Sequence, residues 1–359
     1  MCFACGILSH RLGCAEQVGR TNMNRLTIGR RDFLRGAAAS AATLALASPA
    51  AAAGTAFRFI TPFSFSLAFA PVLYAEAAGY YAENGLDVVI EAAQGAAMAA
   101  QMVIAGQMDA GRTGGTNYLV SRVNNDAPLI SIATIAQISP FFLISSTQEP
   151  VQAVADLKGR TVGLASLGGS MEGTLDLLLI DNGIDPKEVR KVKVADNAAS
   201  FALIEAGRAG AFVGNTSSMI LASAARSDVH AIPMDDGMPG QVYVASPAEI
   251  EAAPEKFIAF LKATHRSARE IAAAEDLGPV LEKLVGKFTI SGAGDAELAK
   301  RDLETNARNW MARGPENLLR NVPEIWAHAV ETLHRADMLD AAPDPTTLYT
   351  NALLERAVA

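Results

Sequence analysis

PVLYAEAAGYYAENGLDV, at residues 71–88, is the stretch from which the fold is predicted. Pro71 favours the start of a helix that runs through Glu76, because proline is tolerated in a first helical turn. Asn84 and Gly85 close the region, since glycine accepts the left-handed backbone that ends many helices. Residues 87–90, an aspartate followed by three apolar residues, predict a strand. The stretch therefore predicts a helix followed by a strand.

The segments on either side extend this alternation. An apolar run at 57–61 predicts a first strand, and residues 96–105 predict a second helix. A turn at 106–109 leads into a third short strand. Strands that alternate with helices favour an α/β fold with a mostly parallel sheet covered on both faces.

The same pattern returns in the middle of the chain. Strands are predicted at 161–165, 189–194 and 211–213, with helical segments at 172–181 and 201–206. We interpret this as two α/β lobes of similar construction, although any two strand–helix–strand units share such a pattern. From residue 248 the sequence becomes helical, with apolar residues at helical spacing that favour packing on a lobe. The helices are predicted at 254–274, 278–286, 296–313 and 323–335.

The amino-terminal region is typical of an export signal. Arg30 and Arg31 precede Phe33 and Leu34, and a weakly apolar alanine-rich stretch ends at Ala53. This layout predicts a twin-arginine signal over residues 1–53, with Met23 as a possible native start, and hence a protein of the periplasm. All 3 cysteines lie before Met23, so we expect none in the mature protein.

Composition excludes several classes of function. The chain has 359 residues and a formal net charge of −8, which gives no electrostatic footprint for nucleic acid. Its length predicts two domains after the signal. No later apolar run is long enough to predict a membrane span.

Three motifs make the resemblance to a known family. They are the stretch at 71–88, AGQMDAG at 105–111 and DLKGRTVG at 156–163. The chain resembles the periplasmic substrate-binding proteins of ABC importers, in the nitrate/sulfonate/taurine and thiamine-precursor (NMT1/THI5-like) group. One departure is Gly210, where the family often has an acid.

The resemblance implies a two-lobe periplasmic-binding-protein fold (type II) with extra C-terminal helices. Residues 54–147 and 240–359 would form lobe 1, and residues 148–239 would form lobe 2. Crossovers are expected near 145–151 and 234–242. A small-molecule ligand would lie between the lobes, which close by a hinge motion. A permease in the inner membrane is the implied partner, and we expect a monomer.

The strand-to-helix loops of lobe 1 supply the first candidate contacts, because ligands of parallel α/β sheets bind beyond the strands' carboxyl ends. Hydroxyl donors are Ser64 and Ser66, and Phe69 is a ring that could stack on a planar ligand. Ser66 fits a helix cap equally well, and core packing is favoured for Phe63. Gln94 follows the second strand, and the alternative there is a simple turn.

The third strand of lobe 1 ends in the most suggestive segment, which contains Arg112 and Thr113 among glycines. An arginine in a cleft binds a carboxylate or sulfonate through two parallel N–H bonds. The alternative is a solvated arginine, or one that forms a salt bridge between the lobes.

Lobe 2 contributes a loop of small residues before its first helix. Ser166, Gly169 and Ser170 could cradle an anion or polar group. Asn215 follows a later strand, where capping a helix is at least as plausible as ligand binding.

No catalytic or metal-binding constellation is apparent in the sequence, so we expect no enzyme activity and no cofactor. The predicted ligand is a small organic anion of the sulfonate or carboxylate class, with Arg112 as counter-charge. One alternative is a neutral aromatic such as a thiamine-precursor pyrimidine, stacked by Phe69 or Tyr118. Another, from a different class, is an exported enzyme on the same fold.

Overall fold

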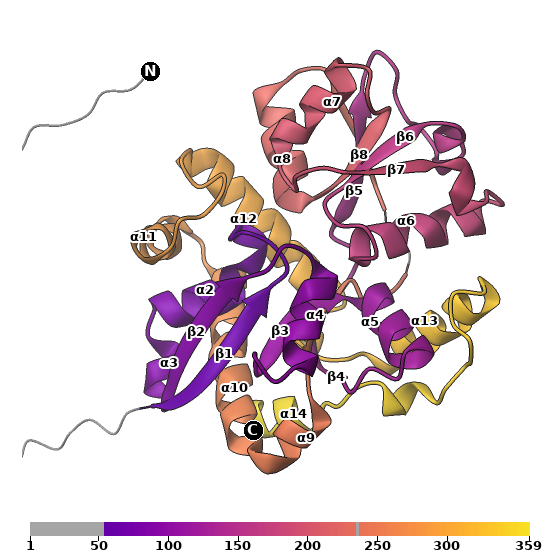
Figure 1. The fold of residues 1–359 in the computed structure, drawn as a ribbon. Helices are drawn as coiled ribbons and strands as arrows, with labels where there is room; N and C mark the ends of the chain where they lie inside the picture. The colour runs from indigo at the N-terminus through magenta and orange to yellow at the C-terminus, as the bar shows by residue number, and fades with distance from the viewer. Residues whose placement is uncertain (1–53, 235–236) are drawn as a thin grey trace, which may run out of the picture. The chain divides into compact units, whose positions relative to one another are not determined.

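Two five-stranded sheets form the framework of the computed structural model, which describes residues 54–234 and 237–359 (Figure 1). The predicted export signal lies outside the described residues, which belong to one unit, Ala53–Ala359. The first sheet has the order β2-β1-β3-β10-β4, and the second has the order β7-β6-β8-β5-β9. The first comprises β1 (Thr55–Thr61), β2 (Leu86–Ala92), β3 (Ala110–Gly114), β4 (Ile130–Ala136) and β10 (Gln241–Ala245). The second comprises β5 (Phe141–Ser146), β6 (Thr161–Leu164), β7 (Arg190–Lys193), β8 (Ala211–Asn215) and β9 (Val229–Pro233).

The two sheets have the same construction, which confirms the predicted α/β fold of two similar lobes. In the first, β1 runs parallel to β2 and β3, whereas β10 runs antiparallel to β3 and β4. In the second, β6 runs parallel to β7 and β8, whereas β5 runs antiparallel to β8 and β9. The parallel prediction therefore holds for three strands of each sheet, and each sheet is mixed.

The chain crosses between the sheets twice. The first crossover lies between the end of β4 at Ala136 and the start of β5 at Phe141, earlier than the expected 145–151. Residues 141–146, of which the first four are apolar, form a strand of the second sheet. The return lies between Pro233 and Gln241, within the expected region. The lobe boundaries at 147 and 239 stay a prediction, and the pairing of β5 favours an earlier start for the second lobe.

Helices cover both faces of the first sheet because its side chains alternate between two apolar clusters. Phe57 and Phe59 of β1 point to one cluster, and Ile60 points to the other. The first cluster includes η1 (Leu67–Phe69), α2 (Ala70–Ala77), α3 (Tyr80–Glu83), α10 (Pro254–Ala273), α11 (Gly278–Lys287), α12 (Ala296–Trp310) and α14 (Ala352–Val358). The second cluster includes α4 (Ala96–Ile104), α5 (Gly115–Asn124) and α13 (Pro323–Arg335). The four predicted C-terminal helices are thus confirmed, and they pack on the first sheet.

The second sheet is covered in the same way by shorter elements. Its larger cluster contains apolar residues of α6 (Ser170–Asp181), and its smaller cluster contains Phe201 and Phe212. The other elements of this lobe are η2 (Val154–Leu157), η3 (Pro186–Glu188), η4 (Ala198–Phe201), α7 (Ala202–Glu205) and α8 (Thr216–Ala225). Three remaining short elements belong to the C-terminal part of the chain, namely α9 (Pro247–Ala252), η5 (Pro315–Asn317) and η6 (Pro345–Thr347).

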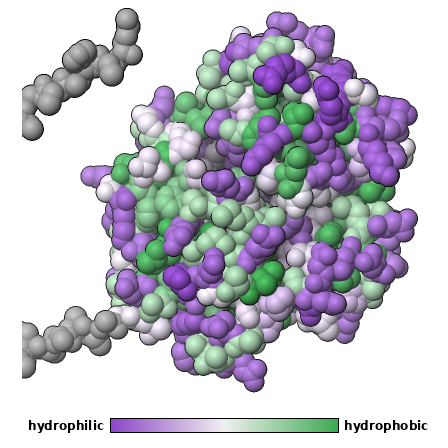
Figure 2. All heavy atoms as spheres, in the orientation of Figure 1, coloured by the Kyte–Doolittle hydropathy of each residue, from purple (hydrophilic) through white to green (hydrophobic). Residues whose placement is uncertain are grey.

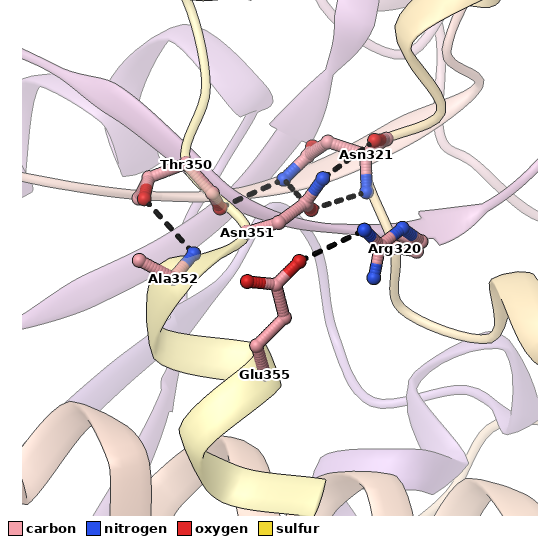
Figure 3. A network of polar contacts seen from close by, with 6 residues as sticks. All are labelled: Arg320, Asn321, Thr350, Asn351, Ala352 and Glu355. Carbon is pink, nitrogen blue, oxygen red and sulfur yellow. Dashed lines mark hydrogen bonds and ion pairs between the residues drawn. The ribbon is translucent and has the colours of Figure 1, made fainter.

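The outer edge of β4 is covered by the C-terminal segment. Isolated bridges join Ser131 to Tyr349 and Thr134 to Leu319. Asn321 is fully buried there, and its Oδ1 accepts hydrogen bonds from both the Ser131 and Thr134 hydroxyls. Its amide also bonds Thr350 and Asn351 at the start of α14 (Figure 3). The edge is therefore protected from pairing with another chain.

Figure 2 shows a face on which hydrophilic and hydrophobic residues are interspersed. In the described segments, we find no helix with the length and apolar character that crossing a membrane requires.

The two crossovers lie against each other at Gly240, which yields a first testable expectation. A Cβ added at Gly240 would lie 2.0 Å from the carbonyl oxygen of Ile138. We expect Gly240→Ala to lower the free energy of unfolding by about 1–3 kcal/mol, because one backbone must move. Urea unfolding followed by circular dichroism would measure it. Gly286→Ala in α11 is the control, since open space surrounds Gly286; equal effects of the two changes would contradict the close approach.

Candidate functional site

The carboxyl ends of the parallel strands in both sheets face one cleft, as expected for this class of sheet. The cleft has two connected parts, which share Phe63, Asp196 and Asn215. The part that we call the inner room is lined also by Phe69, Arg112, Phe141, Ser166, Ser170 and Gln241. The part that we call the outer room is lined also by Ser64, Ser66, Gln94, Lys193, Ser217 and Ser291.

The two rooms differ in size. The inner room has a volume of about 20 Å³, enough for one water-sized molecule. The outer room has a volume of about 280 Å³, which suits a small organic molecule. The lobes touch around the inner room, where the Gly114 N–H donates a hydrogen bond of 2.7 Å to Ser170 Oγ. The structure therefore describes the cleft in a closed arrangement.

Arg112 is the buried cation of the inner room. It lies on β3, is 4% exposed, and pairs in register with Tyr243 of β10. Its guanidinium donates to Ala68 O at 2.6 Å and to Gln241 Oε1 at 3.3 Å, and lies 4.8 Å from the ring centre of Phe69. Burial lowers the pKa of Arg112 to about 10, so it is charged at neutral pH. Every partner that holds it is neutral.

Three buried polar atoms around the cleft have no hydrogen-bond partner in the described residues. They are Ser66 Oγ, Ser166 Oγ and Gln241 Nε2. A buried polar group without a partner costs about 1–3 kcal/mol, so such atoms are rare in folded proteins. The three atoms lie around the cleft that Arg112 lines, and the hydrogen-bond partners of Arg112 are neutral.

Asp196 is an acid that the sequence analysis did not select. It follows β7 and lines both rooms. Its Oδ1 accepts from Ser218 Oγ at 2.9 Å, and its Oδ2 accepts from Asn215 Nδ2 at 2.7 Å. Desolvation raises the pKa of Asp196 to about 6.

Eight of the ten residues predicted to bind ligand line the cleft. Ser64, Ser66 and Gln94 line the outer room, Phe69, Arg112, Ser166 and Ser170 line the inner room, and Asn215 lines both. Thr113 follows Arg112 on β3, so the two side chains point to opposite faces of the sheet. The Thr113 hydroxyl accepts a hydrogen bond from Asn117 Nδ2. Gly169 is the N-cap of α6, behind Ser166. Ligand contact by any of the ten stays a prediction.

The aromatic candidates have packing roles in the structure. Phe69 is 3% exposed, and Arg112 covers a face of its ring. Tyr118 is 1% exposed, packs on Trp326, and donates its hydroxyl to Leu348 O. Phe63 is half-buried and packs against the core of the second sheet. Asn215 caps α8 by accepting from the Ser218 N–H.

Antiparallel strands supply the lining residues that the sequence analysis missed. Gln241 is the first residue of β10, and Phe141 is the first residue of β5. Because these strands run against their neighbours, they begin at the edge where the parallel strands end. The position of Asp196 in the sequence could have identified it as a candidate. It follows the predicted strand that became β7, just as Gln94, which was predicted, follows β2.

A buried acid, Asp302, joins α12 to the second lobe. Asp302 is 2% exposed and accepts hydrogen bonds from Ser217 Oγ of α8 and from Asn306 Nδ2. Desolvation raises the pKa of Asp302 to about 6. Ser217 also lines the outer room, so this contact forms part of the wall of the cleft.

Asp302 should make stability depend on pH. Its folded pKa exceeds the reference value of 3.8, so the folded state binds the proton more tightly, and stability falls as pH rises from about 4 to about 6. We expect the unfolding free energy of Asp302→Asn, relative to the unchanged protein, to rise by up to about 3 kcal/mol over that range. Urea titrations at several pH values would measure it, with the exposed Glu304→Gln as control. A difference that does not vary with pH would contradict the raised pKa.

A larger hollow lies at the other edge of the second sheet. It has a volume of about 770 Å³ and is lined by Arg160, Arg190, Arg208 and Arg226 among other residues. Arg226 is paired with Asp228 and Glu205. The hollow is open and distant from the strand ends that form the cleft. In the described part of the chain, no cluster of three or more histidine, cysteine or acidic side chains has the arrangement of a metal site.

Solved structures with the same fold include binding proteins. The alkanesulfonate-binding protein SsuA from Xanthomonas axonopodis pv. citri, bound to MOPS, has a TM-score of 0.64 and 13% identity, covering 83% of this chain and 99% of its own. The nitrate-binding protein NrtA from Synechocystis PCC 6803 has a TM-score of 0.62 and 14% identity, covering 85% and 88%. A DSZB mutant in complex with biphenyl-2-sulfinic acid has a TM-score of 0.53 and 13% identity, covering 85% and 99%. These likenesses establish the fold alone.

Sequence comparison identifies the family. No curated protein matches the chain. The family model described as NMT1/THI5 like matches residues 66–276, which is more than half of the chain. The matched part includes the parallel strands β2 and β3 of the first sheet and β6, β7 and β8 of the second. The chain therefore belongs to the NMT1/THI5-like family.

Proposed function

We propose that this protein is the solute-binding component of an ABC importer, and that it captures a small organic anion between its two lobes. The ligand would be a sulfonate or a carboxylate. Arg112 carries the proposal, because it is a buried guanidinium that lines the cleft and has only neutral partners. The planar fork of a guanidinium matches the oxygens of such an acid.

The orphaned polar atoms support the same ligand class. Ser66 Oγ, Ser166 Oγ and Gln241 Nε2 include donors on both sides of the cleft. Oxygens of a sulfonate or carboxylate would accept from them, and this would link the lobes in the closed arrangement. A sulfonate or carboxylate group is larger than the water-sized inner room, so binding beside Arg112 would require that room to widen, and the organic part would lie in the outer room.

The setting of the protein follows from the same proposal. We propose that the protein is exported by the twin-arginine route and works in the periplasm. We also propose, from the family resemblance, that it delivers its ligand to a permease in the inner membrane. The SsuA and NrtA likenesses agree with an importer of this kind. The lobes would then comprise the two sheets with their covering helices.

A thermal-shift panel tests the ligand class. It should compare short alkanesulfonates and carboxylates with neutral pyrimidines on the full protein. A ligand at 100 times its dissociation constant adds about 2.7 kcal/mol of stability. We expect a concentration-dependent rise in Tm with at least one acid. A rise with the pyrimidines alone would favour the neutral aromatic ligand, against which the buried positions of Phe69 and Tyr118 argue.

The second candidate is an exported enzyme, which the shared fold of DSZB, an enzyme, keeps open. Turnover distinguishes it from a binding protein. Incubation of the protein with the best acid of the panel, followed by mass spectrometry of the acid, should return it unchanged. Conversion of the acid beyond a single equivalent would favour the enzyme.

A further inference from the structure

The hollow at the other edge of the second sheet gathers arginines, although the chain as a whole has a formal net charge of −8. Three of them come from the starts of neighbouring strands. Arg160 precedes β6, Arg190 is the first residue of β7, and Arg208 lies in the loop before β8. Because β6 lies between β7 and β8, the three cations are neighbours at one edge of the sheet. Like charges in this arrangement repel one another, and an anion among them would offset the repulsion.

The acids of the hollow neutralise its fourth arginine. Arg226 pairs with Glu205 at 2.7 Å and with Asp228 at 2.8 Å. The remaining acid of the lining, Glu149, forms none of the ion pairs found in residues 54–234 and 237–359. Four arginines and three acids leave the lining with a net charge of +1.

The other three arginines keep donors available. Arg190 donates from Nε to Thr161 Oγ1 at 2.8 Å, and Arg160 donates from Nη1 to the carbonyl oxygen of Glu149 at 3.3 Å. The Arg208 side chain is exposed, and none of the three takes part in an ion pair within the described segments. Since a guanidinium carries five N–H donors, each of them can still bind an oxyanion.

The first sheet has an acid where the second has a glycine. The N–H of Asp109 bonds Arg58 O beside β3, and the N–H of Gly210 bonds Thr161 O beside β8 at the same distance of 2.9 Å. The two positions therefore correspond. Asp109 forms an ion pair of 2.7 Å with Lys256 of α10, so the first lobe balances the cation at this edge with an acid of its own chain. Gly210 supplies no acid to the arginines of the second lobe.

Gly210 also leaves room for the nearest arginine. A Cβ at this position would lie 2.9 Å from Arg160 Cδ and 3.4 Å from Arg160 Cβ. The stem of Arg160 therefore lies against the glycine, and an acid in its place would lie beside the guanidinium. The hollow has a volume of about 770 Å³, which is larger than either part of the cleft.

We propose that this hollow is a second ligand site, which binds a phosphate-bearing anion through Arg160, Arg190 and Arg208. A phosphate group carries up to two negative charges and three acceptor oxygens, so it can bond more than one guanidinium at a time. The volume admits a phosphorylated molecule of moderate size, either free or as the headgroup of a lipid. The site lies away from the cleft and does not depend on the ligand proposed there.

Calorimetric titration of the full protein with inorganic tripolyphosphate tests the free anion. We expect Arg208→Gln, a change in an exposed side chain, to weaken binding about tenfold, which corresponds to one charge-assisted hydrogen bond. Arg301→Gln removes an exposed arginine of α12 and should leave the affinity unchanged, as should Arg112→Met in the cleft. Equal losses in Arg208→Gln and Arg301→Gln, or a loss in Arg112→Met alone, would overturn the site.

Co-sedimentation with phosphatidylcholine vesicles that contain phosphatidic acid tests the lipid source. Binding that is lost in Arg208→Gln, without binding of tripolyphosphate, would assign the phosphate to a lipid headgroup. Binding of neither probe would overturn the proposal.

A matched pair at Gly210 tests the missing acid. Gly210→Asp and Gly210→Asn displace Arg160 equally, but only the aspartate adds a negative charge. We expect Gly210→Asp to bind the phosphate probe about tenfold more weakly than Gly210→Asn. Equal affinities would contradict the role of the glycine and of Arg160. Thermal unfolding without ligand checks that both variants fold, and the Arg208→Gln comparison stands without them.

Discussion

Replacing Phe260 by alanine should lower the free energy of unfolding by about 3–5 kcal/mol. Phe260 lies on α10, is fully buried, and stacks on Phe57 and Phe59 of β1 with ring centres 4.5 and 5.2 Å apart. It also stacks on Tyr81 at 5.5 Å. Alanine would leave a cavity where four rings meet, and aromatic pairs add about 0.5–1.5 kcal/mol each beyond the area they bury.

Urea unfolding by circular dichroism would measure this loss, with two comparison variants. Phe260→Leu refills most of the space and should cost much less. Val285→Ala, which changes a side chain 48% exposed on α11, should change stability by about 0.5 kcal/mol or less. A loss of under about 1.5 kcal/mol for Phe260→Ala would contradict the account in which the C-terminal helices are integral to the first lobe.

One residue, Tyr243, connects this aromatic core to the candidate ligand site. The ring of Tyr243 lies 6.2 Å from that of Phe260, and Tyr243 pairs in register with Arg112 across β10 and β3. The aromatic cluster thus supports the strand pair that holds Arg112 in the cleft. We expect Phe260→Ala to weaken ligand binding only through this loss of order.

Arg112→Met should reduce affinity for the best acidic ligand by about 30- to 4,000-fold, which corresponds to about 2–5 kcal/mol. Methionine keeps an unbranched apolar stem against Phe69 but removes the charge that faces the acid. The bond to Ala68 O is lost, at a cost of about 1–3 kcal/mol. Removing a buried charge that has no counter-ion offsets this cost, so the unliganded Tm should change little.

Calorimetric titration of the two proteins gives the affinities, and a thermal scan without ligand gives the stability. Arg160→Met is the matched control, because Arg160 lines the hollow at the other edge of the second sheet. It should leave affinity unchanged. If Arg160→Met weakened binding and Arg112→Met did not, the anion would bind in that hollow, and the cleft proposal would be wrong.

Helix starts, helix ends and helical periodicity could be predicted from the sequence, because each depends on residues that are close together in the chain. Pro71 lies in the first turn of α2, and Gly85 adopts a left-handed backbone with φ of 75°. The helix expected at 323–335 is α13 with the same bounds, since proline begins it and its apolar residues keep one face. Such features depend on neighbours within a few residues.

The strands β5 and β10 could not be placed in this way. Residues 141–146 begin with four apolar residues and are extended, but no local feature of the sequence indicates which sheet they join. Strand β5 pairs with β8 and β9, and β10 pairs with β3 and β4, all of which are distant in the sequence. For this reason Phe141 and Gln241, which begin antiparallel strands at the cleft, were missed.

The loops at the strand ends could be predicted from the sequence as parts of the candidate site. The direction of individual side chains in these loops could not. Arg112 and Thr113 are adjacent, so on a strand they must point to opposite faces. The sequence could not indicate which one faces the cleft. The neutral partners of Arg112 and the orphaned hydroxyl of Ser166 depend on tertiary packing.

The most direct test of the central claim is a crystal structure of the protein with the tightest-binding acid of the panel. The account predicts an acidic group within hydrogen-bond distance of the Arg112 guanidinium, enclosed by residues of both lobes. An acid bound with its charged group away from Arg112, in solvent or beside Arg190 and Arg208, would contradict it.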